Sequence, residues 1–488
     1  MFTDEIVKKN GIVDVETESA SIFELEECIG EGGQGAVYKT QRPNLLVKLS
    51  CASKASFNPN DAYRRYRNFR SRIDLPNNLA KPLSEIKPIE KGGKVFYGYV
   101  MELMDDMVPL SSLHCKKNEK FELYLERLGG IRRIYILLRK LAEILDQIHA
   151  AGYCYGDLNP NNIFVSSNTE YSEVQLIDCD NMTIAADFKD SITFRGFSAP
   201  EIVREHKSNT PLSDTWSFAV VAFFALRQEL PFHGKLVTDA ATMEISAIEK
   251  KEDESDLPFI DDQNEDNAGK TSIFRDVMET EMLQSLFKRT FSGEKSFLTR
   301  PALFEWIEAL RESEMMFIKC KNCGKHYIKV GKKQECPFCD KESHTPYIFI
   351  RNTILAVLDT GFSPGFSPGF SHPAYLLEDT STLMDIPVAQ TMATRIEASF
   401  NATKQQLSIL LTDQKELKAT LIVTEEKTSK NCTLKAGIPL LINVKEGMKY
   451  QILFPEYTLE IDRDEDEPKE DDFPKFRSVI IFTYRGEV

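Results

Sequence analysis

The stretch QIHAAGYCYGDLNPNNIFV, residues 147–165, lies where an apolar helical pattern ends in a polar loop. Before it, apolar residues from Ile134 to Ile148 recur at helical spacing and form one stripe. Further back, residues 22–50 and 80–104 alternate strand-like runs with glycine turns, and residues 58–74 show helical spacing. After it, helical patterns continue to about residue 311. A strand-rich part followed by a helix-rich part predicts an α+β fold of two unlike lobes with a cleft between them.

A glycine-rich hairpin, GEGGQGAVYK at residues 30–39, lies in the strand-rich part. Glycine permits a tight turn whose backbone amides approach phosphate oxygens, where a Cβ atom would collide. Strands flank the glycines on both sides, whereas a helix follows directly in a dinucleotide-binding fold. Val37 could cover an adenine ring, and Lys48 in the next strand could reach the α- and β-phosphates. We therefore predict nucleotide binding by Gly30, Gly32, Gly33, Gly35, Val37 and Lys48.

Further motifs follow in order and carry a family resemblance. They are YGDLNPNN at residues 155–162, VQLID ending at Asp178, APE at residues 199–201, Asp214 in DTWSFAVV, and Arg300 in FLTRPAL. With the glycine-rich hairpin, they resemble the protein-kinase superfamily over residues 22–312. The resemblance implies that the chain uses ATP and Mg²⁺, with Asp157 as the base for the accepting hydroxyl and Asn162 and Asp178 as Mg²⁺ ligands.

The resemblance also implies roles for residues outside the catalytic loop. Lys48 would be catalytic together with Asp157, because it holds the phosphates. The hinge, whose backbone would contact adenine, would consist of Glu102, Leu103 and Met104. Met101 would lie at the back of the adenine pocket. Asp214 would hold the catalytic-loop backbone, and Arg300 would pair with Glu201.

Several positions depart from the kinase pattern. Tyr155 and Gly156 replace the usual His and Arg, so no arginine is present there to bind a phosphorylated activation loop. We therefore expect activity without phosphorylation of Thr193 or Ser198. Asn159 replaces the usual Lys that neutralises the transferring phosphoryl group, and Arg195 is the candidate substitute.

The helix after Lys48 should supply a glutamate partner for this lysine, yet no Glu occurs between Cys51 and Leu75. Asp61 is the candidate partner, and the alternative is a favourable charge at a helix N-terminus. In IDCDN, Asp180 could add a metal ligand or cap a turn. This variant looks similar to motifs of some bacterial kinase-like proteins.

The preserved groups, Lys48, Asp157, Asn162 and Asp178, favour an active serine/threonine protein kinase in a signalling or stress system. The missing Lys and Glu favour the alternative, a pseudokinase that acts as a nucleotide-binding scaffold. Asn159 also keeps open a small-molecule kinase, although the APE motif, Asp214 and Arg300 resemble the protein-directed branch.

A cysteine cluster follows the kinase-like part. Cys320, Cys323, Cys336 and Cys339 form two C-x-x-C knuckles, a pattern that resembles a zinc ribbon. Because all four positions are thiolates, the predicted Zn²⁺ is structural; redox pairs are the alternative.

The spacing of these patterns predicts domain boundaries. We expect an N-terminal extension at residues 1–21, the kinase-like domain at 22–312 with lobes dividing near 104, and the zinc ribbon at 313–345. A linker with a GFSP repeat is expected at 346–397, and a β-sandwich or barrel at 398–488, either a docking module or a structural domain.

Composition bounds the partners and the compartment. The net charge of −15 argues against nucleic acid or an anionic membrane as the main partner. Residues 1–19 do not resemble a signal peptide and the free thiols suit a reducing cytoplasm. The expected partner is a protein substrate, and the domain layout suggests a partner phosphatase.

Overall fold

The computed structural model forms two compact units, Met1–Leu310 and Arg311–Val488. The structure describes residues 4–32, 35–60, 62–63, 67, 75–116, 119–179, 182–184, 194–240, 244–262, 266–269, 275–293, 295, 299–314, 316–328, 335–341, 347–357, 374–378, 382–387, 395–412, 416–423, 426, 428–446, 448–458 and 475–485.

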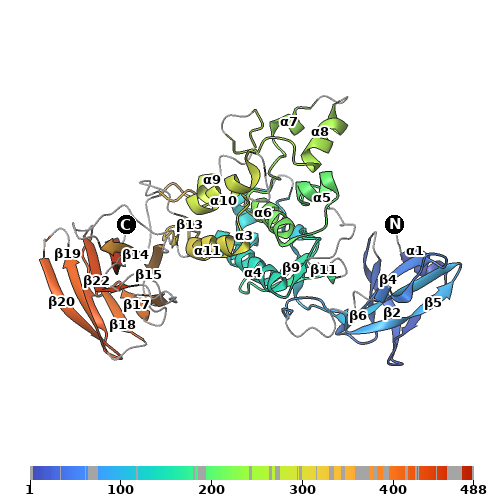
Figure 1. Cartoon of the computed structure of the whole chain (residues 1–488), viewed down its shortest axis with the longest axis horizontal. Helices are drawn as coiled ribbons and strands as arrows, with labels where there is room; N and C mark the ends of the chain where they lie inside the picture. Colours follow the sequence, from blue (N-terminus) through green and yellow to red (C-terminus); the bar gives the residue numbers. More distant parts are fainter. Residues whose placement is uncertain are drawn as a thin grey trace, which may run out of the picture. The chain divides into compact units, whose positions relative to one another are not determined.

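The first unit begins with the small lobe, drawn in blue in Figure 1. It is a six-stranded antiparallel sheet in the order β1-β2-β3-β4-β6-β5. Its strands are β1 (Asp14–Glu16), β2 (Ile22–Glu31), β3 (Ala36–Thr40), β4 (Leu45–Ser53), β5 (Ser84–Lys91) and β6 (Lys94–Glu102). Alternate residues of AVYKT in β3 are buried, as the period of two in a strand requires. The strand-rich lobe is therefore as the sequence predicts.

The N-terminal residues are part of this lobe, so the prediction of a separate extension at residues 1–21 is wrong. Helix α1 (Asp4–Lys9) and strand β1 bring Val7, Ile12 and Val15 into one hydrophobic core with the sheet. An isolated bridge between Thr17 and Ile86 also joins the segment to β5. The few apolar residues of this segment become buried only because they pack against the sheet, so the local sequence does not identify them as core residues.

The large lobe is mainly helical and is built around α6, whose residues from Ser213 to Phe223 are all buried. Its helices are η1 (Leu110–Leu113), α3 (Phe121–Arg127), α4 (Ile131–Ala150), α5 (Pro200–Glu205), α6 (Pro211–Arg227), α7 (Lys235–Thr238), α8 (Ile245–Asp253), α9 (Arg275–Met278), α10 (Glu281–Phe291) and α11 (Leu303–Glu314). Short strands β7 (Met107–Pro109), β8 (Tyr153–Cys154), β9 (Ile163–Ser166), β10 (Val174–Leu176) and β11 (Thr183–Ile184) carry the loops of the candidate site.

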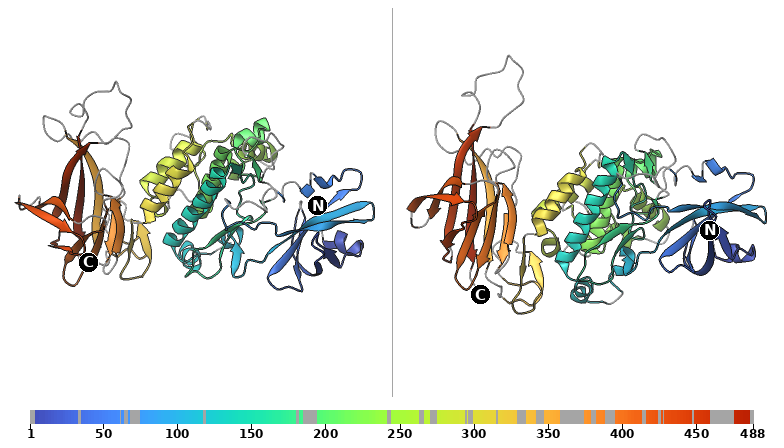
Figure 2. Two further views of the ribbon diagram at one scale, coloured as in Figure 1. Left: turned by 60° about the horizontal axis from the view of Figure 1, so that its bottom comes forward. Right: turned by 90° about the horizontal axis from the view of Figure 1, so that it is seen from below.

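The second unit starts with the small hairpin of β12 (Phe317–Lys319) and β13 (His326–Ile328) and continues as two packed sheets (Figure 2). One sheet has the order β15-β14-β23-β22-β19-β20 and the other β16-β17-β18-β21. The strands are β14 (Tyr347–Val357), β15 (Ala374–Glu378), β16 (Thr382–Pro387), β17 (Arg395–Asn401), β18 (Gln406–Leu411), β19 (Glu416–Val423), β20 (Thr428–Lys435), β21 (Leu440–Asn443), β22 (Lys449–Thr458) and β23 (Lys475–Arg485). Residues of both sheets share one core, as in a sandwich.

The expected linker at residues 346–397 is a second difference from the sequence prediction. It contains β14, β15 and β16, and β14 pairs with β23 along its whole length. The β-rich domain therefore begins at Tyr347 rather than at 398. Strand pairing between residues more than 100 positions apart leaves no local sequence signal. The GFSP repeat at 361–373 lies outside the described residues.

Candidate functional site

The glycine-rich loop, for which the sequence predicts phosphate binding, joins β2 to β3. Gly30 lies in β2, and the Gly32 N–H donates a hydrogen bond to Gly35 O at 2.9 Å. A Cβ atom on Gly35 would lie 2.4 Å from Leu49 O, so only glycine fits there. Gly33 lies outside the described residues. The described residues on either side of the turn are thus joined by one backbone hydrogen bond, and phosphate binding by the glycines stays a prediction.

Lys48 and Asp178 form an ion pair at the centre of the site. The Lys48 Nζ atom, on β4, lies 2.8 Å from Asp178 Oδ1, and the lysine side chain is only 4% exposed. Asp178 follows β10 and has a φ of +56°, a conformation that a non-glycine residue adopts only when its surroundings impose it. The two predicted phosphate- and metal-binding groups are therefore in direct contact.

Asp157 lies in the loop between β8 and β9, held by two asparagines. Asn162 Nδ2 donates to Asp157 Oδ2 at 3.0 Å, and Asn159 Nδ2 donates to Asp157 Oδ1 at 3.0 Å. Asn159 is almost fully buried, so its amide orients the carboxylate from within the loop. The Ile177 N–H donates to Asn162 O at 3.0 Å and joins this loop to the Asp178 strand.

Asp214 holds the backbone of the catalytic loop, residues 155–162, through hydrogen bonds. Its carboxylate accepts hydrogen bonds from the Tyr155 N–H at 2.7 Å and the Gly156 N–H at 2.9 Å. His149 Nε2 lies 2.9 Å from the same carboxylate. The Tyr155 hydroxyl donates to Ile177 O, and burial raises the pKa of this tyrosine well above its usual value. The buried Tyr155 side chain thus occupies the position at which the kinase pattern has histidine.

A second buried pair locks the large lobe. Arg300 binds the Glu201 carboxylate through two contacts of 2.9 and 3.1 Å. The Arg300 guanidinium also lies 4.9 Å from the centre of a Trp216 ring. The contact that the APE resemblance implies is therefore present.

The residues expected to contact adenine form an apolar cluster. Leu46 pairs with Met101 across β4 and β6, and both are buried, with Val37 and Leu103 packed against them. The Leu103 N–H donates to Asn44 O at 2.9 Å. Glu102, at the end of β6, is exposed, and Met104 is partly buried. The predicted hinge residues thus lie beside this apolar cluster, and their contact with adenine stays a prediction.

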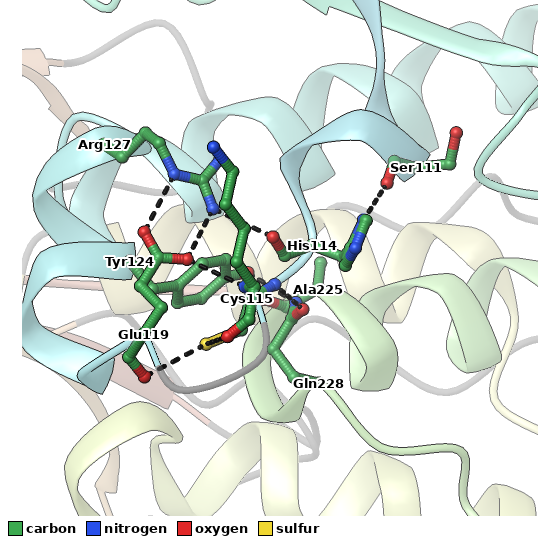
Figure 3. A network of polar contacts seen from close by, with 9 residues as sticks. Ser111, His114, Cys115, Glu119, Tyr124, Arg127, Ala225 and Gln228 are labelled. Carbon is green, nitrogen blue, oxygen red and sulfur yellow. Dashed lines mark hydrogen bonds and ion pairs between the residues drawn. The ribbon is translucent and has the colours of Figure 1, made fainter.

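The segment after the hinge is fixed by a polar network (Figure 3). The Cys115 N–H donates to Gln228 Oε1 at 2.8 Å, which ties the segment to the end of α6. Arg127 Nη2 donates to His114 O at 2.8 Å and lies 2.9 Å from Glu119 Oε2. The Arg127 guanidinium lowers the pKa of Glu119 to about 2. This network positions the chain between the hinge and α3.

The partner predicted for Lys48, Asp61, lies outside the described residues, as do Asp180 and Thr193. Sequence reasoning missed a different pair in this region. Arg67 lies 2.9 Å from Glu85 Oε2, and the Glu85 side chain is 3% exposed although it is ionisable. A glutamate within an alternating strand offered no signal that it pairs with Arg67.

The suggestion that Arg195 replaces the missing lysine is not supported. Its guanidinium lies 2.8 Å from Asp253 and 3.5 Å from Glu249, both on α8. Arg204, on α5, lies 2.9 Å from Asp256. Asp253 and Asp256, in the acidic stretch at residues 250–267, therefore bind the segment around the APE motif.

The four cysteines of the second unit gather at one point. Cys320 Sγ lies 3.7 Å from Cys339 Sγ, Cys323 Sγ lies 3.7 Å from Cys336 Sγ, and all four sulfur atoms lie within 4.8 Å of one another. Four thiolates bound to a tetrahedral Zn²⁺ at about 2.3 Å would lie about 3.8 Å apart. Gly324 has a φ of +73°, as a tight first knuckle needs. The donor set and spacing fit Zn²⁺.

Comparison with known proteins adds a family match. The protein kinase domain family matches residues 23–294, more than half of the chain. Human ribosomal protein S6 kinase alpha-2 is 36% identical over 233 residues, which cover 45% of this chain and 29% of that protein. Serine/threonine-protein kinase dkf-2 of Caenorhabditis briggsae is 26% identical over 232 residues, covering 45% and 18%. Serine/threonine-protein kinase mos of Patiria pectinifera is 23% identical over 227 residues, covering 44% and 60%.

The similarity thus spans less than two thirds of the length of these relatives. All three come from animals, so the bacterial likeness of IDCDN stays a prediction. Among the described residues, no helix has the length and apolar character needed to cross a bilayer.

Proposed function

Because the chain belongs to the protein kinase domain family, we propose that it is an ATP- and Mg²⁺-dependent serine/threonine protein kinase. The observation that carries the proposal is the joining of two pairs, Lys48 with Asp178 and Asp157 with Asn162, through the Ile177–Asn162 hydrogen bond. Protein kinase domains in general use ATP with Mg²⁺, and these are the groups that hold both.

Three residues of this chain would bind the phosphates and Mg²⁺. Lys48 would bind the α- and β-phosphates as a point charge, after Asp178 has positioned its ammonium group. Asn162 uses its Nδ2 group on Asp157, which leaves its amide oxygen as the ligand for Mg²⁺ beside Asp178. Bound Mg²⁺ would neutralise phosphate charge, as divalent ions do in phosphoryl transfer.

Asp157 would act on the acceptor. The acceptor hydroxyl oxygen forms a bond to the γ-phosphorus while the bond from that phosphorus to the bridging oxygen of ADP breaks, and the hydroxyl proton passes to the Asp157 carboxylate. Two amides orient this carboxylate, so its position before the reaction is already defined. We propose a protein hydroxyl as the acceptor, because the Glu201–Arg300 pair maintains the segment that receives a peptide in protein-directed kinases.

The alternative is a pseudokinase that binds nucleotide as a scaffold. Asn159 favours it, because its amide is used on Asp157 and supplies no charge to the transferring phosphoryl group. Loss of one such transition-state contact costs on the order of 10²-fold in rate. We therefore expect slow transfer rather than none.

The deciding experiment measures transfer of labelled phosphate from ATP with Mg²⁺ by the purified chain. Asp157→Asn and Asp178→Asn should each abolish transfer. Asp146→Asn, the same substitution at an exposed site on α4, is the matched control and should not change it. Nucleotide binding without transfer in the unmodified chain would favour the pseudokinase. Absence of binding would refute both proposals.

For the second unit we propose a structural Zn²⁺ held by the four cysteines. Tyr347, the first residue of β14, is buried in the same cluster as Cys320 and Cys336. The metal would therefore stabilise the start of the β-sandwich as well as the hairpin.

A further inference from the structure

The first residue of helix α1, Asp4, makes polar contacts with both strands of the phosphate-binding hairpin. The Asp4 backbone N–H donates to Glu31 Oε2 at 3.0 Å, and Glu31 ends β2 between Gly30 and Gly32. The Tyr38 hydroxyl, on β3, donates to Asp4 Oδ1 at 3.2 Å. Asp4 thus links the strand that enters the loop to the strand that leaves it.

The position of α1 itself is well determined by packing. Val7 and Ile12 are 1% and 5% exposed and share a core with Tyr38. The Leu25 N–H donates to Val13 O at 2.8 Å, so the segment after α1 is also paired with β2. A helix anchored in this way can restrain the groups that its first residue contacts.

Tyr38 provides a chemical reason for the contact to persist. Its side chain is 2% exposed, and a buried hydroxyl needs a hydrogen-bond partner. Because Asp4 is a charged acceptor, its hydrogen bond to Tyr38 is stronger than one between neutral groups. Burial together with the Asp4 carboxylate raises the pKa of Tyr38, so the hydroxyl remains a donor throughout the physiological range.

We propose that Asp4 is a positioning residue of the nucleotide site, which acts through Glu31 and Tyr38 to hold the two arms of the phosphate-binding hairpin. The inference rests on the proposed function, since it assigns a role in ATP binding. A loop whose arms are held in place loses less conformational entropy when it closes on phosphates, so the bound nucleotide is favoured. Asp4 itself does not contact the nucleotide.

The test compares Asp4→Ala with Glu5→Ala in the full chain. Glu5 is an exposed carboxylate on the same turn of α1, so both variants lose one negative charge. Two quantities are measured, hydrogen–deuterium exchange of amides at residues 28–38 and ATP affinity by calorimetry. Asp4→Ala should speed exchange in this segment and weaken ATP binding about 3- to 10-fold, since loss of a charge-assisted hydrogen bond changes an equilibrium constant by about tenfold. Glu5→Ala should change neither.

A conservative variant separates positioning from general destabilisation. The backbone N–H that donates to Glu31 is present in every variant, so these variants test the contact with Tyr38. Asp4→Asn keeps an acceptor oxygen for the Tyr38 hydroxyl, so it should restore most of the affinity. Tyr38→Phe keeps the buried ring and removes the hydroxyl, so it should reproduce the faster exchange at unchanged fold. Equal exchange in Asp4→Ala and Glu5→Ala would overturn the proposal whether or not the chain binds ATP. Faster exchange with unaltered ATP affinity would also overturn it, whereas a chain that binds no ATP refutes the proposed function separately.

Discussion

Replacement of Asp214 by alanine is expected to destabilise the large lobe strongly. The Asp214 carboxylate is 2% exposed and is contacted by the Tyr155 N–H, the Gly156 N–H and His149 Nε2 at 2.7, 2.9 and 2.9 Å. Alanine provides no acceptor, and water has little access to the cavity that remains. The donors of the catalytic loop would therefore be left without partners in a buried environment.

The magnitude follows from the number of donors. An unsatisfied buried donor costs about 1–3 kcal/mol. The two backbone donors therefore predict a loss of about 2–6 kcal/mol in the free energy of unfolding, and the His149 imidazole adds to this loss as far as it stays without an acceptor. Whole domains are stable by only about 5–15 kcal/mol. Asp214→Asn retains one acceptor oxygen and should lose about 1–3 kcal/mol.

Tryptophan fluorescence during urea unfolding measures the loss in free energy of unfolding in the unit that contains Asp214. The chain has only two tryptophans, Trp216 on α6 and Trp306 on α11. Both are fully buried and lie in the first unit, so unfolding of the second unit does not contribute directly to the signal. A loss below about 1 kcal/mol in Asp214→Ala would refute the reasoning, since one unpaired donor alone exceeds it. Asp146→Asn is again the control.

Three other outcomes are expected. Elemental analysis should find one Zn²⁺ per chain, and Cys336→Ser should lose it without shifting the tryptophan unfolding curve, because both tryptophans lie in the other unit. Arg195→Ala and Asp253→Ala should each slow phosphoryl transfer about two- to fivefold, because their exposed ion pair, worth about 0.2–1 kcal/mol, positions the segment before the APE motif. The low pKa of Glu119, about 2, gives stability that is present above pH 4.5 and lost as the pH falls toward 2. Arg127→Ala should therefore show a smaller decrease of the urea midpoint between about pH 6 and pH 3.

A separate result would contradict each of these three predictions. Zinc well below one per chain would reject the four-thiolate site. Unchanged transfer in both Arg195→Ala and Asp253→Ala would show that α8 does not position the segment. Identical pH profiles for Arg127→Ala and the unmodified chain would show that the ion pair in Figure 3 does not lower the pKa of Glu119 in solution.

Features whose chemistry is local in sequence could be predicted. Asp157 and Asn162 are five positions apart in one loop, and each C-x-x-C knuckle is a single turn, so residue type and spacing suffice. Asp214 and Arg300 were placed by resemblance, and their contacts with Gly156 and Glu201 are present in the structure.

Features that depend on distant pairing could not be predicted. Residues 4–18 are mostly polar, and only the sheet beneath them makes Val7 and Val15 core residues. Strand β14 pairs with β23, more than 100 residues away, and this pairing leaves no signal in the local sequence. The GFSP repeat that follows β14 therefore made the whole region resemble a linker. The acidic run at 250–267 has a composition typical of a solvated loop, and only the fold brings Asp253 to Arg195.

The place of β23 in its sheet has a consequence for biosynthesis. This strand lies between β14 and β22, so the first strand of the sandwich has its main partner only at residues 475–485. During translation, the kinase unit can fold while the sandwich still lacks an interior strand. Until residue 485 has left the ribosome, β14 and β22 present open edges to chaperones or to neighbouring chains. A frameshift or nonsense codon shortly before residue 475 would therefore yield a chain with a folded kinase unit and an aggregation-prone second unit.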